Sequence, residues 1–193
     1  MGTSSNFGNM LSMALASLVL PFLPLLPIQI LLNNLLYDLS EIGIPFDDVD
    51  ADDVREPHGW SMRDILRFTV VMGVVSSLFD ATTFAVLIKV FDADAATFQT
   101  AWFVESIATQ ILVIFLIRSR KPIWASRPNA ILVLTSLGAL AVAIGIVLAP
   151  LRHWFGFVAI DAHLGLTIMV IVAGYLVAAE FAKRFVVGRP RGK

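Results

Sequence analysis

The stretch that decides the fold is PFLPLLPIQILLNNLLYDLSEIGIPFDDVD, residues 21–50. Most of it is apolar enough to cross a bilayer, yet it contains Asn33, Asn34 and the ionisable Asp38. A charged side chain at the centre of a bilayer costs about 2.5 to 3.5 kcal/mol on insertion scales, so it usually lies on an ion path or beside a buried partner. The stretch therefore predicts a membrane helix in which Asp38 is a candidate functional residue.

The composition of the chain indicates an integral membrane protein. Hydrophobic residues make up 58% of the 193 residues, charged residues only 15%, and the mean hydropathy is +0.82. Soluble domains are about 45–50% apolar. With about 20 apolar residues needed for each span, the chain has room for about six helices and for no large soluble domain. The absence of cysteine excludes disulfides, thiolate metal sites and cysteine nucleophiles.

Six long apolar segments, bounded by charges, prolines or turn residues, account for most of the chain. None shows the period-two alternation of a β-strand, so strands are not expected. The predicted fold is an all-α membrane protein, a bundle of six transmembrane helices that forms one domain over residues 1–193. The predicted spans are 4–21, 24–43, 65–91, 99–117, 130–149 and 163–187.

The distribution of basic residues predicts how the bundle is oriented, because cytoplasmic loops and tails are enriched in Lys and Arg. With these six spans, 12 of the 14 basic residues lie on one side, and only Lys89 and Arg152 lie on the other. Both termini are then cytoplasmic. The turn PFLPLLP and the links 92–100 and 152–161 are expected outside.

Polar side chains at helical spacing within the first two spans predict a cation site. Asn6 and Asn9 are three residues apart, and Asn34 is followed at helical spacing by Tyr37 and Asp38. Each set is expected to share one helix face, and the two faces are expected to converge. Amide and carboxylate oxygens are hard ligands that suit Mg²⁺ or Ca²⁺. Alternatively, the amides only form hydrogen bonds between helices.

Two further carboxylates are candidate metal ligands. Asp80 lies about 22 Å along the third span, at a rise of 1.5 Å per residue, which places it well inside the membrane. Glu105 lies near the outer part of the fourth span. The alternatives are an internal hydrogen bond or ion pair for Asp80 and exposure at the membrane interface for Glu105.

Charged groups near the predicted cytoplasmic face have simpler explanations. Glu180 precedes Lys183 and Arg184 at helical spacing and is expected to form ion pairs with them. The acidic run 47–56 is expected to be a solvated loop, although it has the composition to attract Mg²⁺. The basic tail KRFVVGRPRGK, residues 183–193, fits topological anchoring or binding of anionic lipid. His58, His153 and His163 are expected at the surface.

Several motifs in the same order resemble the C-terminal membrane half of bacterial magnesium-transporting P-type ATPases. The resemblance extends over the whole chain and is strongest before Pro128. The matching motifs are SSNFGN (4–9), LPFLPLLPIQILLNNLLYD (20–38), IPFDDVD (44–50), SSLFD (76–80), WFVES (102–106) and IRSRKPIWASRP (117–128).

This resemblance implies roles for particular positions. In P-type cation pumps, Asn6, Asn34 and Asp38 would fall on ligand positions, and Glu105 on a position that can contribute a ligand. Asn9 is similar in position to a glutamate of calcium pumps, and Tyr37 to a threonine. Both differences weaken a calcium assignment and are compatible with one Mg²⁺, which often keeps several waters.

The same resemblance implies a partner that this chain does not encode. The Asp-Lys-Thr-Gly-Thr phosphorylation loop and the Thr-Gly-Glu-Ser dephosphorylation loop do not occur in the sequence. The chain is therefore not expected to hydrolyse ATP alone, and ATP is expected to act only through missing phosphorylation and nucleotide-binding domains. The implied location is the bacterial cytoplasmic membrane, and no nucleic acid is expected as a partner.

Three functions are compatible with the sequence. The favoured one is the transport half of a Mg²⁺-ATPase, as a fragment or a split subunit. The second is a regulatory or assembly protein derived from such a pump, and the third is a secondary transporter that uses Asp38, Asp80 and Glu105 for proton or cation coupling. Inverted repeats would favour the third, but the two halves of the sequence show no convincing internal symmetry.

Overall fold

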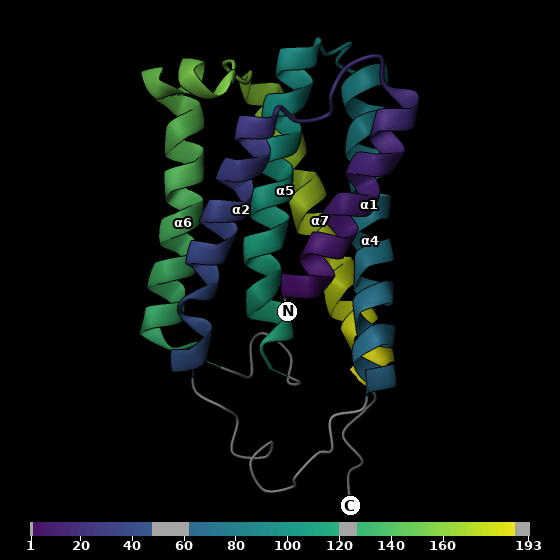
Figure 1. The fold of residues 1–193 in the computed structure, drawn as a ribbon, viewed down its shortest axis with the longest axis vertical. Coiled ribbons are helices and arrows are strands. Elements are labelled where there is room, and N and C mark those ends of the chain that lie inside the picture. Colours follow the sequence, from purple (N-terminus) through teal and green to yellow (C-terminus); the bar gives the residue numbers. More distant parts are fainter. Residues whose placement is uncertain (1, 48–61, 120–126, 188–193) are drawn as a thin grey trace, which may run out of the picture.

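The computed structural model describes residues 2–47, 62–119 and 127–187 as a bundle of long helices (Figure 1). These residues contain no β-strand, which confirms the predicted all-α class. The α-helices are α1 (Gly2–Val19), α2 (Pro27–Glu41), α4 (Met62–Lys89), α5 (Ala95–Ile117), α6 (Ala130–Leu148) and α7 (Ala162–Val187). Two short 3₁₀ helices, η1 (Ile44–Phe46) and η3 (Pro150–Phe155), follow α2 and α6.

Four of these helices are long and apolar enough to cross a membrane, namely α4, α5, α6 and α7. This confirms a multi-pass membrane protein. Helix α1 has 18 residues and α2 only 15, so the six-span count stays a prediction. Helix α2 begins three residues later than predicted because Pro27 takes its first position, where proline needs no hydrogen-bond donor, and the chain before it is not helical.

Helix α5 forms the centre of the bundle. Within its membrane window 78% of the residues are buried, against 28% for each of α4, α6 and α7. Its aromatic side chains pack against those of neighbouring segments, with Trp102 edge-on to Phe84 and Phe103 close to Phe157. Most side chains of α5 therefore meet another helix rather than lipid.

The other helices pair around α5. Helix α1 packs mainly on α4, and α2 packs mainly on α6, while α7 contacts both α4 and α5. The α2–α6 pair depends on Gly43, because a Cβ there would lie 2.5 Å from the Cα of Leu132. Beyond this close approach, the hydroxyl of Ser136 donates a hydrogen bond of 3.1 Å to the carbonyl of Ser40.

The links that were predicted to lie outside gather at one end of the bundle (Figure 1). Side-chain amides bind backbone there. Gln29 Nε2 donates to the carbonyl oxygen of Phe155 at 3.0 Å, and Gln99 Nε2 donates to that of Leu23 at 2.8 Å. The Thr100 hydroxyl accepts from the backbone N–H of Val158 at 3.1 Å. These bonds fasten α2, α5 and the α6–α7 connection to one another.

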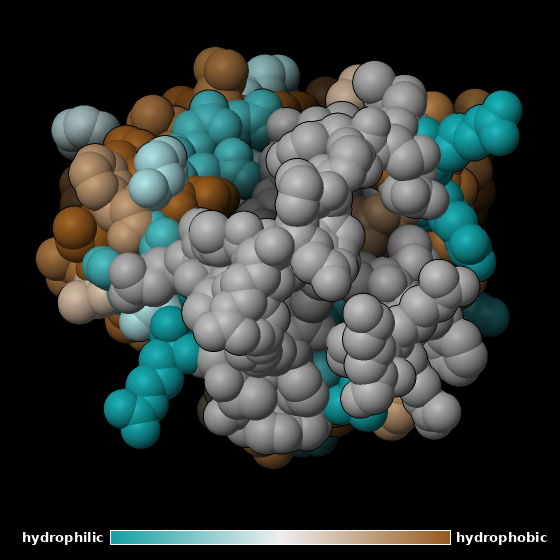
Figure 2. Space-filling view, turned by 90° about the horizontal axis from the view of Figure 1, so that it is seen from below, coloured by the Kyte–Doolittle hydropathy of each residue, from teal (hydrophilic) through white to brown (hydrophobic). Residues whose placement is uncertain are grey.

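The opposite end is held by charged groups. Asp47 forms an ion pair with Arg118 after α5 and accepts a hydrogen bond of 2.8 Å from the backbone N–H of Asn129 before α6. Its side chain is 11% exposed, so Asp47 is not the solvated loop residue that the sequence predicts. The rest of the acidic run, and His58, lie outside the described residues. Figure 2 shows this end from below, where hydrophilic side chains lie in several places beside hydrophobic ones.

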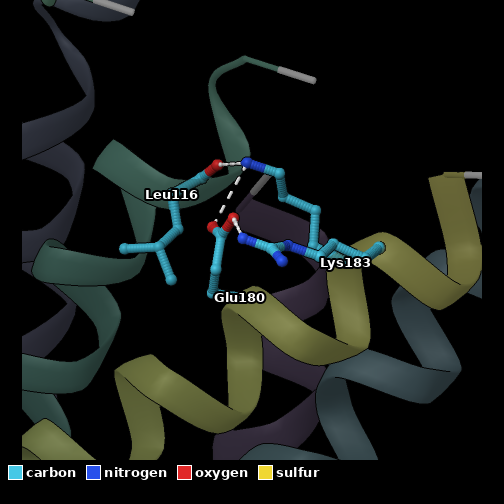
Figure 3. Close-up of polar contacts among 4 residues, drawn as sticks. Leu116, Glu180 and Lys183 are labelled. Atoms are coloured by element: carbon cyan, nitrogen blue, oxygen red, sulfur yellow. Dashed lines mark hydrogen bonds and ion pairs between the residues drawn. The ribbon is translucent and has the colours of Figure 1, made fainter. Parts of the chain in front are cut away.

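Lys183 joins the last helix to the central one at this end (Figure 3). Its Nζ donates a hydrogen bond of 2.7 Å to the carbonyl of Leu116 in the last turn of α5, and lies 3.4 Å from Glu180 Oε2. Arg184 also pairs with Glu180 at 3.4 Å, so the predicted ion pairs of Glu180 are confirmed. A cation at the C-terminus of a helix is favourable because the last carbonyls are partly negative.

Candidate cation site

The six predicted metal ligands fall into two groups. Asn9, Asp80 and Glu105 are buried inside the bundle, whereas Asn34 and Asp38 lie on the exposed side of α2. Asn6 lies within α1, and its side chain is outside the described part of the structure. The structure thus gathers Asn9, Asp80 and Glu105 inside the bundle. It leaves Asn34 and Asp38 on a side of α2 that none of the described helices covers.

The side chain of Asp80 on α4 joins three helices through hydrogen bonds. It is 4% exposed, and its two oxygens accept hydrogen bonds from the hydroxyl of Ser12 on α1 at 2.5 Å and from the indole N–H of Trp102 on α5 at 2.9 Å. The internal hydrogen bond that was the alternative reading of Asp80 is therefore present. A carboxyl group that accepts two hydrogen bonds suits either a structural anchor or a hard-cation ligand.

Glu105 lies next to this junction. It is buried in the bundle, so the alternative of a carboxylate exposed at the membrane interface is wrong. Its side chain is close enough to Asp80 for the two carboxyl groups to interact. Within the described residues, its Oε2 accepts no hydrogen bond. A buried acceptor without a donor costs about 1–3 kcal/mol, so this oxygen is available to a ligand or a proton.

A chain of hydrogen bonds links the other buried amides across three helices. Asn33 Nδ2 on α2 donates to Gln110 Oε1 on α5 at 3.3 Å, and Gln110 Nε2 donates to Ser106 Oγ at 2.7 Å. Ser106 Oγ then donates to Asn9 Oδ1 on α1 at 3.4 Å. The polar groups of the first two spans are therefore connected through α5.

Helix α2 presents different groups on its two sides. Gln29, Asn33, Tyr37 and Ser40 are buried, and Asn34 and Asp38 are exposed. The prediction that Tyr37 shares a face with Asn34 and Asp38 is wrong, because Tyr37 is 1% exposed and its hydroxyl donates to Glu41 Oε1 at 2.9 Å. Adjacent positions on a helix differ by about 100°, so Tyr37 lies one step around the helix from Asp38.

Sequence reasoning noted Asn33 only as a polar residue of the second span, and it missed the other partners in this region, which are Ser12, Trp102, Ser106 and Gln110. Ser106 and Gln110 are four residues apart in a predicted span that also carries Glu105 and Thr109. That density of polar groups in one span signals a helix shielded from lipid, because polar side chains in membranes face other helices.

The donor set is suited to a hard cation with few protein ligands. Among the described residues, no group of three or more His, Cys, Asp or Glu side chains is placed to hold a metal ion. Binding here would depend on amide, hydroxyl and carboxylate oxygens. Mg²⁺ is typically held by one or two carboxylates and keeps several waters, so such a sparse set is compatible with it.

Comparison with known proteins agrees with this chemistry. Residues 22–185 match the family model described as cation transporting ATPase, C-terminus. The chain is 37% identical over 190 residues to the magnesium-transporting ATPase, P-type 1, of Salmonella typhimurium strain LT2, and 36% identical to the protein of that name from Escherichia coli K12. Each alignment covers 96% of this chain and 21% of the relative, so the chain spans about a fifth of the length of these relatives.

Proposed function

The chain belongs to the family of cation-transporting ATPase C-terminal regions, and we propose that it is the part of a P-type pump that binds and translocates Mg²⁺. The observation that carries the proposal is the exposed side of α2. There Asn34 and Asp38 stand among exposed apolar side chains, including those of Leu31, Leu35 and Leu39. A carboxylate that faced lipid at this depth would be costly, so the face needs a covering element and a cation.

The ligands of the proposed site come from four helices. Asn34 and Asp38 supply oxygens from α2, and Asn6 and Asn9 supply them from α1. Asp80 on α4 and Glu105 on α5 add carboxyl oxygens, which are hard ligands that suit a divalent cation such as Mg²⁺. Asp80 and Trp102 also fix the separation of α4 and α5 through their hydrogen bond of 2.9 Å.

The proposed energy source lies outside this chain. The sequence contains no phosphorylation loop, and its relatives are about five times longer than the region it matches. We propose that phosphorylation and nucleotide-binding domains act on α1 and α2 from the cytoplasm. The concentration of basic residues at one end of the bundle supports a bacterial cytoplasmic membrane location with both termini inside, and with lipid around α4, α6 and α7.

The function is tested by transport in the full-length polypeptide that carries these residues. Asp38→Asn removes the charge but keeps the size of the side chain, and we expect Mg²⁺ uptake into proteoliposomes to be lost while membrane insertion is retained. Asp161→Asn is the matched control, because Asp161 is an exposed carboxylate in the α6–α7 link. Uptake by Asp38→Asn at the rate of the control variant would refute the proposal.

A further inference from the structure

The amide chain from α2 to α1 ends on an oxygen that has no donor. Asn33 is 1% exposed, its Nδ2 donates to Gln110, and its Oδ1 accepts no hydrogen bond within the described residues. The other acceptors of the chain, on Gln110, Ser106 and Asn9, each receive one. The lack of a donor is therefore localised at one atom, on the helix that also carries Asn34 and Asp38.

The hydrogen bonds at the two ends of this chain of amides are weak. The Asn33–Gln110 and Ser106–Asn9 distances are 3.3 and 3.4 Å, whereas the central Gln110–Ser106 distance is 2.7 Å. N–H···O bonds are usually about 2.7–3.2 Å and O–H···O bonds about 2.5–3.0 Å, so both end contacts are long and the middle one is short. An end amide can thus turn toward a ligand at small cost while Gln110 and Ser106 keep their contact.

The hydrogen bonds of this chain of amides can run in two directions. A side-chain amide places an oxygen and an NH₂ group at nearly equivalent positions, and a hydroxyl both donates and accepts. Turning the three amides by 180° would reverse every hydrogen bond without moving the helices. In the direction seen here the oxygen without a donor is on Asn33, and in the reverse direction Asn9 Oδ1 is released from Ser106. One end oxygen is available in either case.

We propose that Asn33 is a further cation-binding residue, and that its side-chain oxygen binds a hard divalent cation when the chain runs in the direction seen here. This inference rests on the proposed function, because Asn33 is linked through Gln110 and Ser106 to Asn9, one of the proposed ligands. Amide oxygens are ligands for Mg²⁺ and Ca²⁺, and a bound cation would take the place of the hydrogen-bond donor that Asn33 Oδ1 lacks within the described residues. In the reverse direction the same role passes to Asn9 on α1.

The test uses Mn²⁺ as a paramagnetic probe and measures its binding to the full-length polypeptide in lipid nanodiscs by electron paramagnetic resonance. Asn33→Leu removes the oxygen, and we expect the Kd to rise about tenfold, the size of one hydrogen-bond-like contact to a charged group. Asn33→Asp keeps the oxygen, adds charge and removes the donor to Gln110. If Asn33 is a ligand, the added charge faces the cation, and this variant binds Mn²⁺ more tightly than the parent.

A purely structural role predicts a different pattern. If Asn33 only ties α2 to α5, a turned Gln110 donates to the new carboxylate of Asn33→Asp, so this variant keeps the tie and leaves the Kd for Mn²⁺ unchanged. The matched control is Gln99→Glu, which places a carboxylate at a different buried amide. Gln99 lies on α5 and takes no part in the hydrogen-bonded chain of amides. We expect it to leave the Kd for Mn²⁺ unchanged, and tightening equal to that of Asn33→Asp would overturn the inference as a general effect of charge.

The inference and the proposed function fail separately. Mn²⁺ binding that is lost in Asp38→Asn but unchanged in Asn33→Leu would overturn the role of Asn33 and leave the function standing. Absence of Mn²⁺ binding to the parent polypeptide would overturn both. Circular dichroism of each variant checks the fold, and Asn33→Asp decides the question if Asn33→Leu does not fold.

Discussion

Replacing Gly43 by alanine should separate the ends of α2 and α6. An added Cβ would lie 2.4 Å from Thr135 Oγ1, 2.5 Å from Leu132 Cα and 3.0 Å from Leu132 N. The hydroxyl of Thr135 has a second rotamer to adopt, but the backbone of Leu132 has no such freedom. The end of α2 must therefore move away from α6 by several tenths of an ångström or more.

The cost of this movement follows from two contributions. Inserting a methyl group where none fits typically costs 1–3 kcal/mol, because the backbone shifts to make room. The shift also stretches the hydrogen bond of 3.1 Å from Ser136 Oγ to the carbonyl of Ser40, and such a bond contributes about 0.5–1.5 kcal/mol. We expect Gly43→Ala to lower the free energy of unfolding by about 2–4 kcal/mol.

The assay is reversible unfolding in mixed detergent micelles, followed by far-ultraviolet circular dichroism. Gly138→Ala on α6 is the matched control, because a Cβ there meets no atom within 4 Å. Alanine favours a helix interior over glycine by about 1 kcal/mol, so the control should be neutral or slightly more stable than the parent. Equal stabilities of the two variants would refute the claim that α2 and α6 meet at Gly43.

Three further predictions concern the ends of helices. Asp92 has a φ of +45°, so Asp92→Gly should stabilise the α4–α5 turn by about 0.5–1 kcal/mol in the same unfolding assay, and a loss of stability would contradict the strain. Lys183→Met should destabilise by about 1–3 kcal/mol by leaving the Leu116 carbonyl without its charged donor, whereas Lys183→Arg should recover part of the loss; equal losses would argue against the contact. Hydrogen bonds from Thr97 hold the pKa of Asp94 below its ordinary value of 3.8. The contribution of Asp94 to stability is therefore present above that pH and is lost as the pH falls through the lowered pKa. Asp94→Asn should make unfolding less dependent on pH in this acidic range, and an unchanged pH profile would contradict the helix cap.

Apolar segments predicted the helices well because membrane helices need length and hydrophobicity, both of which the sequence displays. The predicted span 130–149 matches α6, observed at Ala130–Leu148. Helix α2 was predicted too long because the residues before Pro27 are as apolar as those after it. Hydrophobicity indicates burial in lipid or protein, but it does not distinguish helical from extended backbone around closely spaced prolines.

The arrangement of the candidate site was less accessible from the sequence. The deep position of Asp80 was predicted from its place in a span, but its pairing with Ser12 and Trp102 depends on which helices are neighbours. Spacing alone also misplaced Tyr37, because residues three apart on a helix share a face only approximately, and packing against α5 and α6 decided which side of α2 is buried.

The hydrogen bonds of Gln29 and Gln99, at the end of the bundle where the α1–α2 and α6–α7 links lie, have a consequence for how this protein can change over evolution. Gln29 and Gln99 recognise the carbonyls of Phe155 and Leu23, which every amino acid possesses. The attachments therefore do not depend on the identity of the residues that accept them. Leu23 and Phe155 can be substituted without removing these bonds, whereas a change at Gln29 or Gln99 removes one outright. The segments that carry Leu23 and Phe155 are thus expected to diverge in sequence while their backbone keeps the same path.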